Sequence, residues 1–112
     1  RQAIHNHFSG VVEETEEGDR IANALGDKTV LFMQNHGILS TGPSIDIALW
    51  YYFSLERCCQ SQLMADAAGK TTLIPHETAI KTREFIANDL AAWASFQPLF
   101  DMITEQEPDL LD

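Results

Sequence analysis

The stretch that most limits the fold is residues 45–68, which contains neither glycine nor proline. Ser44 stands directly before it at a favourable N-cap position, and Gly69 directly after it can end a helix. We therefore predict one long helix over residues 45–68. Its first half, residues 49–53, is apolar or aromatic on every side. A helix without a polar face is buried on more than one side, so either a sheet and another helix or a second subunit must cover it.

The sequence before this helix predicts alternating helix and strand. Acidic residues from Glu14 onward lead into a helical stripe, which Gly26 closes. The apolar run Val30 to Met33 predicts a buried strand, and residues 38–40 predict a second short strand. Asn35-His36-Gly37 is then the corner between them. Residues 1–12 predict an irregular segment or a short strand.

The sequence after residue 69 predicts more helix. Pro75 can start a helix whose apolar residues recur at helical spacing up to Phe96. Pro98 predicts a kink or a new helix start, followed by a last amphipathic turn or two before Pro108. The ordered mixture of strands and long helices predicts an α/β protein.

Charge excludes two classes of partner. Seven Lys and Arg stand against seventeen Asp and Glu, which gives a formal net charge of −10. Such a surface repels phosphate backbones and anionic lipid heads, so we expect neither nucleic acid nor a membrane as partner. The acids cluster at residues 13–19 and 105–112, and both clusters predict solvated helix ends or a frayed tail.

The other composition signals predict a cytoplasmic protein with ordinary packing. The only cysteines, Cys58 and Cys59, are adjacent and have no second pair for a disulfide framework or a zinc site. No apolar run approaches ~18 residues, and no secretory signal pattern opens the chain. Nucleophile-elbow, P-loop and G-x-G-x-x-G motifs are absent from the sequence.

The histidines carry the candidate chemistry. His5 and His7 form an H-x-H pair, which on a strand could bind one divalent ion, although two histidines near a polar chain start are more often ordinary surface residues. His36 lies at the corner between two predicted strands beside a glycine, a place where function often sits. Its alternative role is a histidine bonded to neighbouring backbone. His76 follows Pro75 at a predicted helix start, where capping or solvent contact is expected.

The order of these features resembles the C-terminal half of the class II aldolase/adducin family. The resemblance runs from about His5 to Gly69 and rests on the whole pattern rather than on one tripeptide. The matching segments are Leu25-Gly26-Asp27-Lys28, the strand before Asn35-His36-Gly37, the second strand with Gly42, and the long helix with Leu55-Glu56-Arg57 and Ala67-Ala68-Gly69.

This resemblance implies a three-layer α/β/α sandwich, of which residues 1–112 supply the C-terminal part. It implies that His36 is a ligand of Zn²⁺ or another divalent metal, with the other two ligands and an acid on an upstream segment. His5 and His7 are not assigned as that pair, because they lie too near His36 and their segment resembles a different stretch of the family. The resemblance also implies a homotetramer with sites between subunits. Arg1 in place of Met agrees with a chain that is part of a longer protein.

Three functions follow as hypotheses. The first is a metal-dependent lyase of aldolase, epimerase or decarboxylase type, acting on a small sugar-phosphate-like or hydroxy-keto substrate in carbohydrate metabolism, with no other cofactor. The second is an adducin-like, non-catalytic assembly module with the same fold. The third is an interaction domain unrelated to the family. His36 favours the lyase, because a non-catalytic module has no need of a metal ligand.

Overall fold

A computed structural model describes residues 2–7 and 15–112 of the chain. It contains two compact units, Arg1–Gly42 and Pro43–Asp112. The boundary between them falls at Gly42 and Pro43, where the sequence breaks between the second strand and the long helix. Strands occur in the first unit and helices dominate the second, which confirms the mixture of helix and sheet predicted from the sequence.

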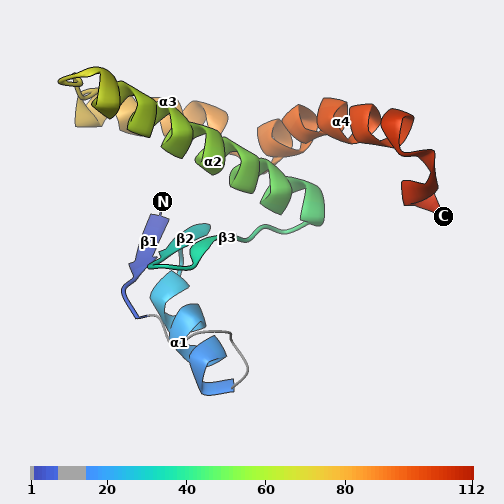
Figure 1. Cartoon of the computed structure of the whole chain (residues 1–112), viewed down its shortest axis with the longest axis horizontal. Coiled ribbons are helices and arrows are strands. Elements are labelled where there is room, and N and C mark those ends of the chain that lie inside the picture. Colours follow the sequence, from blue (N-terminus) through green and yellow to red (C-terminus); the bar gives the residue numbers. More distant parts are fainter. Residues whose placement is uncertain (1, 8–14) are drawn as a thin grey trace. The chain divides into compact units, whose positions relative to one another are not determined.

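The first unit is a three-stranded sheet with one helix (Figure 1). Strand β1 (Gln2–His5) pairs in parallel with β2 (Val30–Met33), which pairs in antiparallel with β3 (Gly37–Ser40). Helix α1 (Thr15–Leu25) connects β1 to β2 and contacts both strands. The parallel pair needs such a crossover because a tight turn cannot join parallel strands.

Central strand β2 supplies the core of this unit. Leu31 is 0% exposed, whereas its neighbours along the strand are half-buried. The predicted strand over Val30 to Met33 is confirmed at both bounds, and β3 begins at Gly37, one residue earlier than predicted. The short strand predicted within residues 1–12 is confirmed as β1. Glu14, where the predicted helical stripe begins, and residues 8–12 of the first predicted segment lie outside the described residues.

The second unit consists of helices. Helix α2 (Ile45–Ala68) confirms the long predicted helix at both ends, with Ser44 and Gly69 at its cap positions. The N-cap position predicted for Ser44 is confirmed, although its hydroxyl forms no capping hydrogen bond. The Ser44 carbonyl oxygen instead accepts a hydrogen bond from the Ala48 backbone N–H at 3.1 Å. Helices α3 (His76–Ile86) and α4 (Asp89–Gln106) and the 3₁₀ helix η1 (Pro108–Leu111) follow.

The predicted helix from Pro75 to Phe96 is divided in two at Ala87 and Asn88. The Asn88 side-chain oxygen accepts a hydrogen bond from the Ala91 backbone N–H at 2.9 Å and so caps α4. An asparagine side chain competes with helix continuation in this way, and its cap explains the break. The new helix start that was one alternative for Pro98 is wrong, because Pro98 lies inside α4, whereas the kink that was the other alternative stays a prediction.

Helix α2 packs against α4 in this unit. The buried apolar side chains are Ile47 from α2 and Ala92 and Phe96 from α4, and the Gln97 amide donates a hydrogen bond to the Asp46 carboxylate at 3.3 Å. Within this unit, α4 covers one side of α2, and the side chains of Leu49, Tyr52 and Phe53 on α2 are each about 40% exposed. The expectation that a sheet or a second subunit covers the other sides of this helix stays a prediction.

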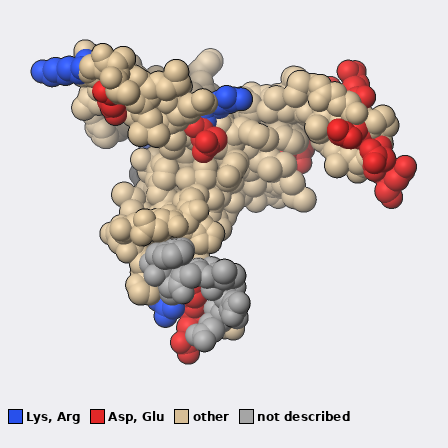
Figure 2. All heavy atoms as spheres, in the orientation of Figure 1, with Lys and Arg blue, Asp and Glu red and all other residues tan. Residues whose placement is uncertain are grey.

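Acidic side chains gather toward the end of α4 and over η1, as Figure 2 shows in red. Glu105, Glu107, Asp109 and Asp112 are all exposed there, which confirms the predicted solvated cluster. The frayed tail predicted for the same residues is wrong in part, because residues 108–111 form η1. Among the described residues, no helix combines the length and the apolar character needed to cross a membrane.

We predict that Leu31→Ala lowers the free energy of unfolding by about 2–5 kcal/mol, because it leaves a cavity beside the central strand. Leu31→Met is the control, since it nearly conserves volume and should cost less than about 1.5 kcal/mol. Urea unfolding of the intact protein measures both values. Equal small losses for the two variants would contradict the assignment of Leu31 to the core.

Candidate functional site

His36 lies in the turn that joins β2 to β3 and is exposed. Hydrogen bonds fix the start of this turn. The Gln34 backbone N–H donates to the His5 carbonyl oxygen at 2.9 Å, and the His36 backbone N–H donates to the Met33 carbonyl oxygen at 3.1 Å. The backbone of His36 therefore belongs to a short turn that is hydrogen-bonded to the ends of β1 and β2, and the corner predicted at Asn35-His36-Gly37 is confirmed.

The backbone on either side of His36 adopts unusual conformations. Asn35 has φ of 57°, and it is the only non-glycine residue with positive φ in the described part of the chain. Asparagine tolerates this left-handed conformation better than most residues. Gly37 has φ of 150°, but a Cβ added there would meet no atom within 4 Å. Gly37 is therefore required by its backbone conformation rather than by a close neighbour in the described chain.

A buried polar cluster joins β1 to α1 in the same unit. His5 and Glu17 are the buried polar residues of the described chain, at 9% and 5% exposure. The His5 Nε2 lies 3.2 Å from one Glu17 carboxylate oxygen. Arg20 binds the other oxygen through its Nε at 2.7 Å and through a terminal guanidinium nitrogen. A buried carboxylate is tolerated when its oxygens are matched by donors in this way.

The burial of Glu17 corrects the prediction that the whole acidic cluster over residues 13–19 is solvated. Glu16 and Asp19 are exposed, but Glu17 is buried against β1. Its position carried a signal, because Glu17 precedes Ile21 and Leu25 at intervals of four on the same helical stripe. A carboxylate that extends an apolar stripe by one turn faces the core and needs a partner there.

The structure does not assemble a complete metal site from the described residues. No group of three or more His, Cys, Asp or Glu side chains in residues 2–7 and 15–112 is placed to hold a metal ion. The His5 ring is engaged with Glu17, and its centroid lies 6.3 Å from that of His7 in an edge-on arrangement. His76 begins α3 and is exposed, and Cys58 and Cys59 are free thiols on α2. His36 is the candidate ligand that the turn presents.

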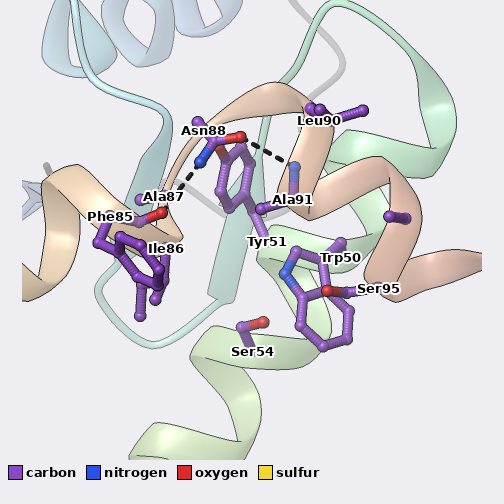
Figure 3. Close-up of a pocket in the computed structure, with 11 residues that line it drawn as sticks. Trp50, Tyr51, Ser54, Phe85, Ile86, Ala87, Asn88, Leu90, Ala91 and Ser95 are labelled. Atoms are coloured by element: carbon purple, nitrogen blue, oxygen red, sulfur yellow. Dashed lines mark hydrogen bonds between the residues drawn. The ribbon is translucent and has the colours of Figure 1, made fainter.

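The second unit has a hollow of about 730 Å³ of its own, between α2 and the corner where α3 meets α4 (Figure 3). Figure 3 shows the Tyr51 ring pointing toward Asn88, whose amide donates a hydrogen bond to the Phe85 carbonyl oxygen at 3.0 Å. The lining is mainly apolar and aromatic, with a few hydroxyl and amide groups. The residues are Trp50, Tyr51, Ser54, Phe85, Ile86, Ala87, Asn88, Leu90, Ala91, Ala94 and Ser95.

Tyr51 is the titratable group that this hollow perturbs. Burial raises the pKa of its phenol above the usual value of 10.0, and the negative charge of Asp89 raises the pKa further. Both effects disfavour the phenolate. The Tyr51 phenol is therefore protonated at and above physiological pH, where it can donate and accept hydrogen bonds.

We predict that Asn35→Ala lowers the free energy of unfolding by about 1 kcal/mol, because a residue with an ordinary Cβ pays that much in the left-handed conformation. Asn35→Gly is the matched control and should be close to neutral. Urea midpoints of the two variants provide the comparison. A greater loss in the glycine variant would show that the Asn35 side chain, rather than its φ angle, matters for stability.

We predict that Tyr51 ionises above pH 10 and that Asp89→Asn lowers its pKa part of the way, because burial remains the larger cause. The folded state binds this proton more tightly than the unfolded chain. The corresponding stability is thus complete below pH 10 and is lost as pH rises through the folded pKa. Tyrosinate absorbance of the wild type minus that of Tyr51→Phe measures the titration, and a midpoint below pH 10 would contradict it.

Comparison with known proteins agrees with this arrangement. Residues 3–63 match the family described as Class II Aldolase and Adducin N-terminal domain. Decarboxylase NovR of Streptomyces niveus is 37% identical over 107 residues, which cover 96% of this chain and 40% of that protein. Alpha-adducin of Rattus norvegicus is 32% identical over 65% of this chain and 10% of its own length.

The solved structure of L-fuculose 1-phosphate aldolase from Glaciozyma antarctica superposes with a TM-score of 0.81 at 32% identity, covering 96% of this chain and 40% of that one. The present chain thus spans less than half the length of these relatives. The family match covers β1 through most of α2 and includes the turn with His36. The chain belongs to the class II aldolase and adducin family.

Proposed function

We propose that the intact protein is a metal-dependent lyase in which His36 is one ligand of a divalent cation, with zinc as the preferred metal. The observation that carries this proposal is the placement of His36: an exposed imidazole on a turn whose start is hydrogen-bonded to both preceding strands. A neutral imidazole nitrogen is a good zinc ligand, and a ligand held by backbone hydrogen bonds needs little reorganisation to bind.

The remaining ligands belong to the proposal as well. Catalytic zinc sites use three protein ligands and keep a position open for water or substrate. No group of three or more His, Cys, Asp or Glu side chains in residues 2–7 and 15–112 is placed to supply such a site. We therefore place the other ligands and the proton-transferring acid on parts of the intact protein that this chain does not contain.

The proposed chemistry is cleavage of a carbon–carbon bond next to a carbonyl group. When bound, a divalent cation supplies Lewis-acid stabilisation of the negative charge that develops on the carbonyl oxygen. The role of this chain is to hold the His36 ring in one direction. The positive φ angles of Asn35 and Gly37 set that direction, because they fix how the turn leaves β2 and enters β3.

For the substrate, we propose a small sugar-phosphate-like or hydroxy-keto compound. Two relatives support this class by their names, a decarboxylase and an L-fuculose 1-phosphate aldolase, and both align with 96% of this chain. Aldol cleavage and decarboxylation both leave an electron pair beside a carbonyl, so one metal site could support either reaction. The net charge of −10 agrees with a small molecule rather than a nucleic acid as partner.

We also propose that residues 1–112 form the C-terminal part of one three-layer α/β/α domain, which assembles into a cytoplasmic homotetramer. The exposed apolar residues of α2 support this assembly, because Leu49, Tyr52 and Phe53 need covering in a stable protein. Further apolar side chains on the second unit are even more exposed: Leu63, Met64, Leu73, Ile74, Phe85 and Leu90.

The alternative is an adducin-like assembly module without catalysis. The family includes adducins, and alpha-adducin aligns with 65% of this chain. The longer alignment with the decarboxylase, over 96% of the chain, favours the enzyme. The module hypothesis requires no metal, which makes the two functions separable by one measurement.

We predict that the intact wild-type protein binds about one divalent metal ion per chain and that His36→Ala loses most of it, because a zinc site with one ligand fewer binds weakly. Metal analysis after dialysis measures the content, and carbon–carbon lyase activity should fall in parallel. His7→Ala and His76→Ala are matched controls on exposed histidines and should retain the metal.

Two outcomes would overturn this assignment. Equal metal content in the wild type and His36→Ala would remove His36 as a ligand. A wild-type protein that takes up no Zn²⁺, Fe²⁺ or Mn²⁺ when these are supplied would instead favour the adducin-like module.

A further inference from the structure

The buried His5–Glu17 pair lies at the end of β1, directly beside the turn that carries His36. His5 is the last residue of β1 and pairs with Met33, the last residue of β2. Directly after the His5–Met33 pair of the two strands, the His5 carbonyl oxygen accepts a hydrogen bond from the Gln34 backbone N–H at 2.9 Å. His5 thus contacts Glu17 through its side chain and Gln34, the first residue of the turn, through its backbone.

We propose that Glu17 and His5 are positioning residues for His36, an inference that rests on the proposed function. The contact between the His5 Nε2 and the Glu17 carboxylate, at 3.2 Å, fixes how the last residue of β1 is oriented. That orientation aims the His5 carbonyl at Gln34, and the turn then continues to the His36 N–H, which bonds to Met33 at 3.1 Å.

Burial makes this pair a better anchor than a surface pair. An exposed ion pair rearranges freely. A buried carboxylate that separates from its donors stays desolvated without hydrogen bonds to offset the free-energy cost. Glu17 is buried at 5% exposure, and Arg20 binds its second oxygen from the solvent side. The His5 ring and the Arg20 guanidinium thus occupy different oxygens of the same carboxylate.

The charged groups around the pair give the experiment its controls. Glu16 is exposed, carries the same charge as Glu17 and lies next to it on α1. Ile21, half-buried one turn further along α1, can be truncated to weaken the helix without touching the pair.

The test measures backbone hydrogen exchange and Zn²⁺ affinity in the intact protein. We expect Glu17→Leu to speed exchange of the Gln34 and His36 amides about tenfold and to weaken Zn²⁺ binding about tenfold, the scale known for residues that orient metal ligands. Glu17→Gln keeps an oxygen that can accept from His5 and should rescue most of both effects. Glu16→Gln, which changes an exposed carboxylate next to Glu17, should change neither readout to a comparable degree.

A second variant covers the case in which Glu17→Leu does not fold. His5→Phe keeps a ring of similar size but removes the nitrogen, while Glu17 retains Arg20. It should loosen the same two amides, and the double variant with Glu17→Leu should be no worse than the stronger single variant, because both remove one interaction.

Two results would overturn the proposal. One is unchanged exchange at Gln34 and His36 in His5→Phe and in a folded Glu17→Leu. The other is faster exchange spread evenly over β2 and β3, as in Ile21→Ala, which would mark the pair as a general stabiliser. These outcomes are separate from failure of the lyase assignment, because exchange in the metal-free protein still reports on the turn if Zn²⁺ does not bind.

Discussion

The parallel pairing of β1 with β2 is the constraint on which the arrangement around His36 depends. It sets Met33 opposite His5 and continues by one hydrogen bond, from the Gln34 N–H to the His5 carbonyl. A parallel pair is less stable per residue than an antiparallel one and requires a crossover connection. Helix α1 supplies that connection and also brings Glu17 to the end of β1. The secondary structure of this unit and its polar cluster are therefore consequences of the same connection.

That arrangement removes the Glu17 carboxylate from water, which costs desolvation free energy. Apolar packing could hold α1 to the sheet at a lower desolvation cost, since replacing a buried ion pair by apolar residues is often neutral or stabilising. Directional hydrogen bonds add what apolar contacts lack, a fixed orientation of one side chain relative to another. Such an orientation is of use where a neighbouring turn has to present a ring in one direction, which is the role proposed for the turn with His36.

The sequence predicted much of the fold, and for identifiable reasons. The bounds of α2 and β2 were predictable because glycine, proline and apolar runs act locally. The division between α3 and α4 was missed because the apolar spacing continues across it. The break comes from the Asn88 side chain, which caps the start of α4. Pro98 does not begin a new helix, since α4 continues through it, so only the kink remains of the two alternatives predicted there. Local signals thus succeeded where no side chain competed with the backbone.

The candidate site was predictable only in part, because its members differ in how they are placed. His36 was found from its position between two strands and beside Gly37, which are features of adjacent residues. The relation of His36 to Glu17 was not predicted from the sequence. It depends on the contact between His5 and Glu17, which are 12 residues apart, and on the register of β1 with β2. Register is set by three-dimensional pairing rather than by composition. A candidate ligand such as His36 can therefore be recognised in a sequence more readily than the residues proposed to orient it. The orientation of the imidazole decides whether it can coordinate a metal ion.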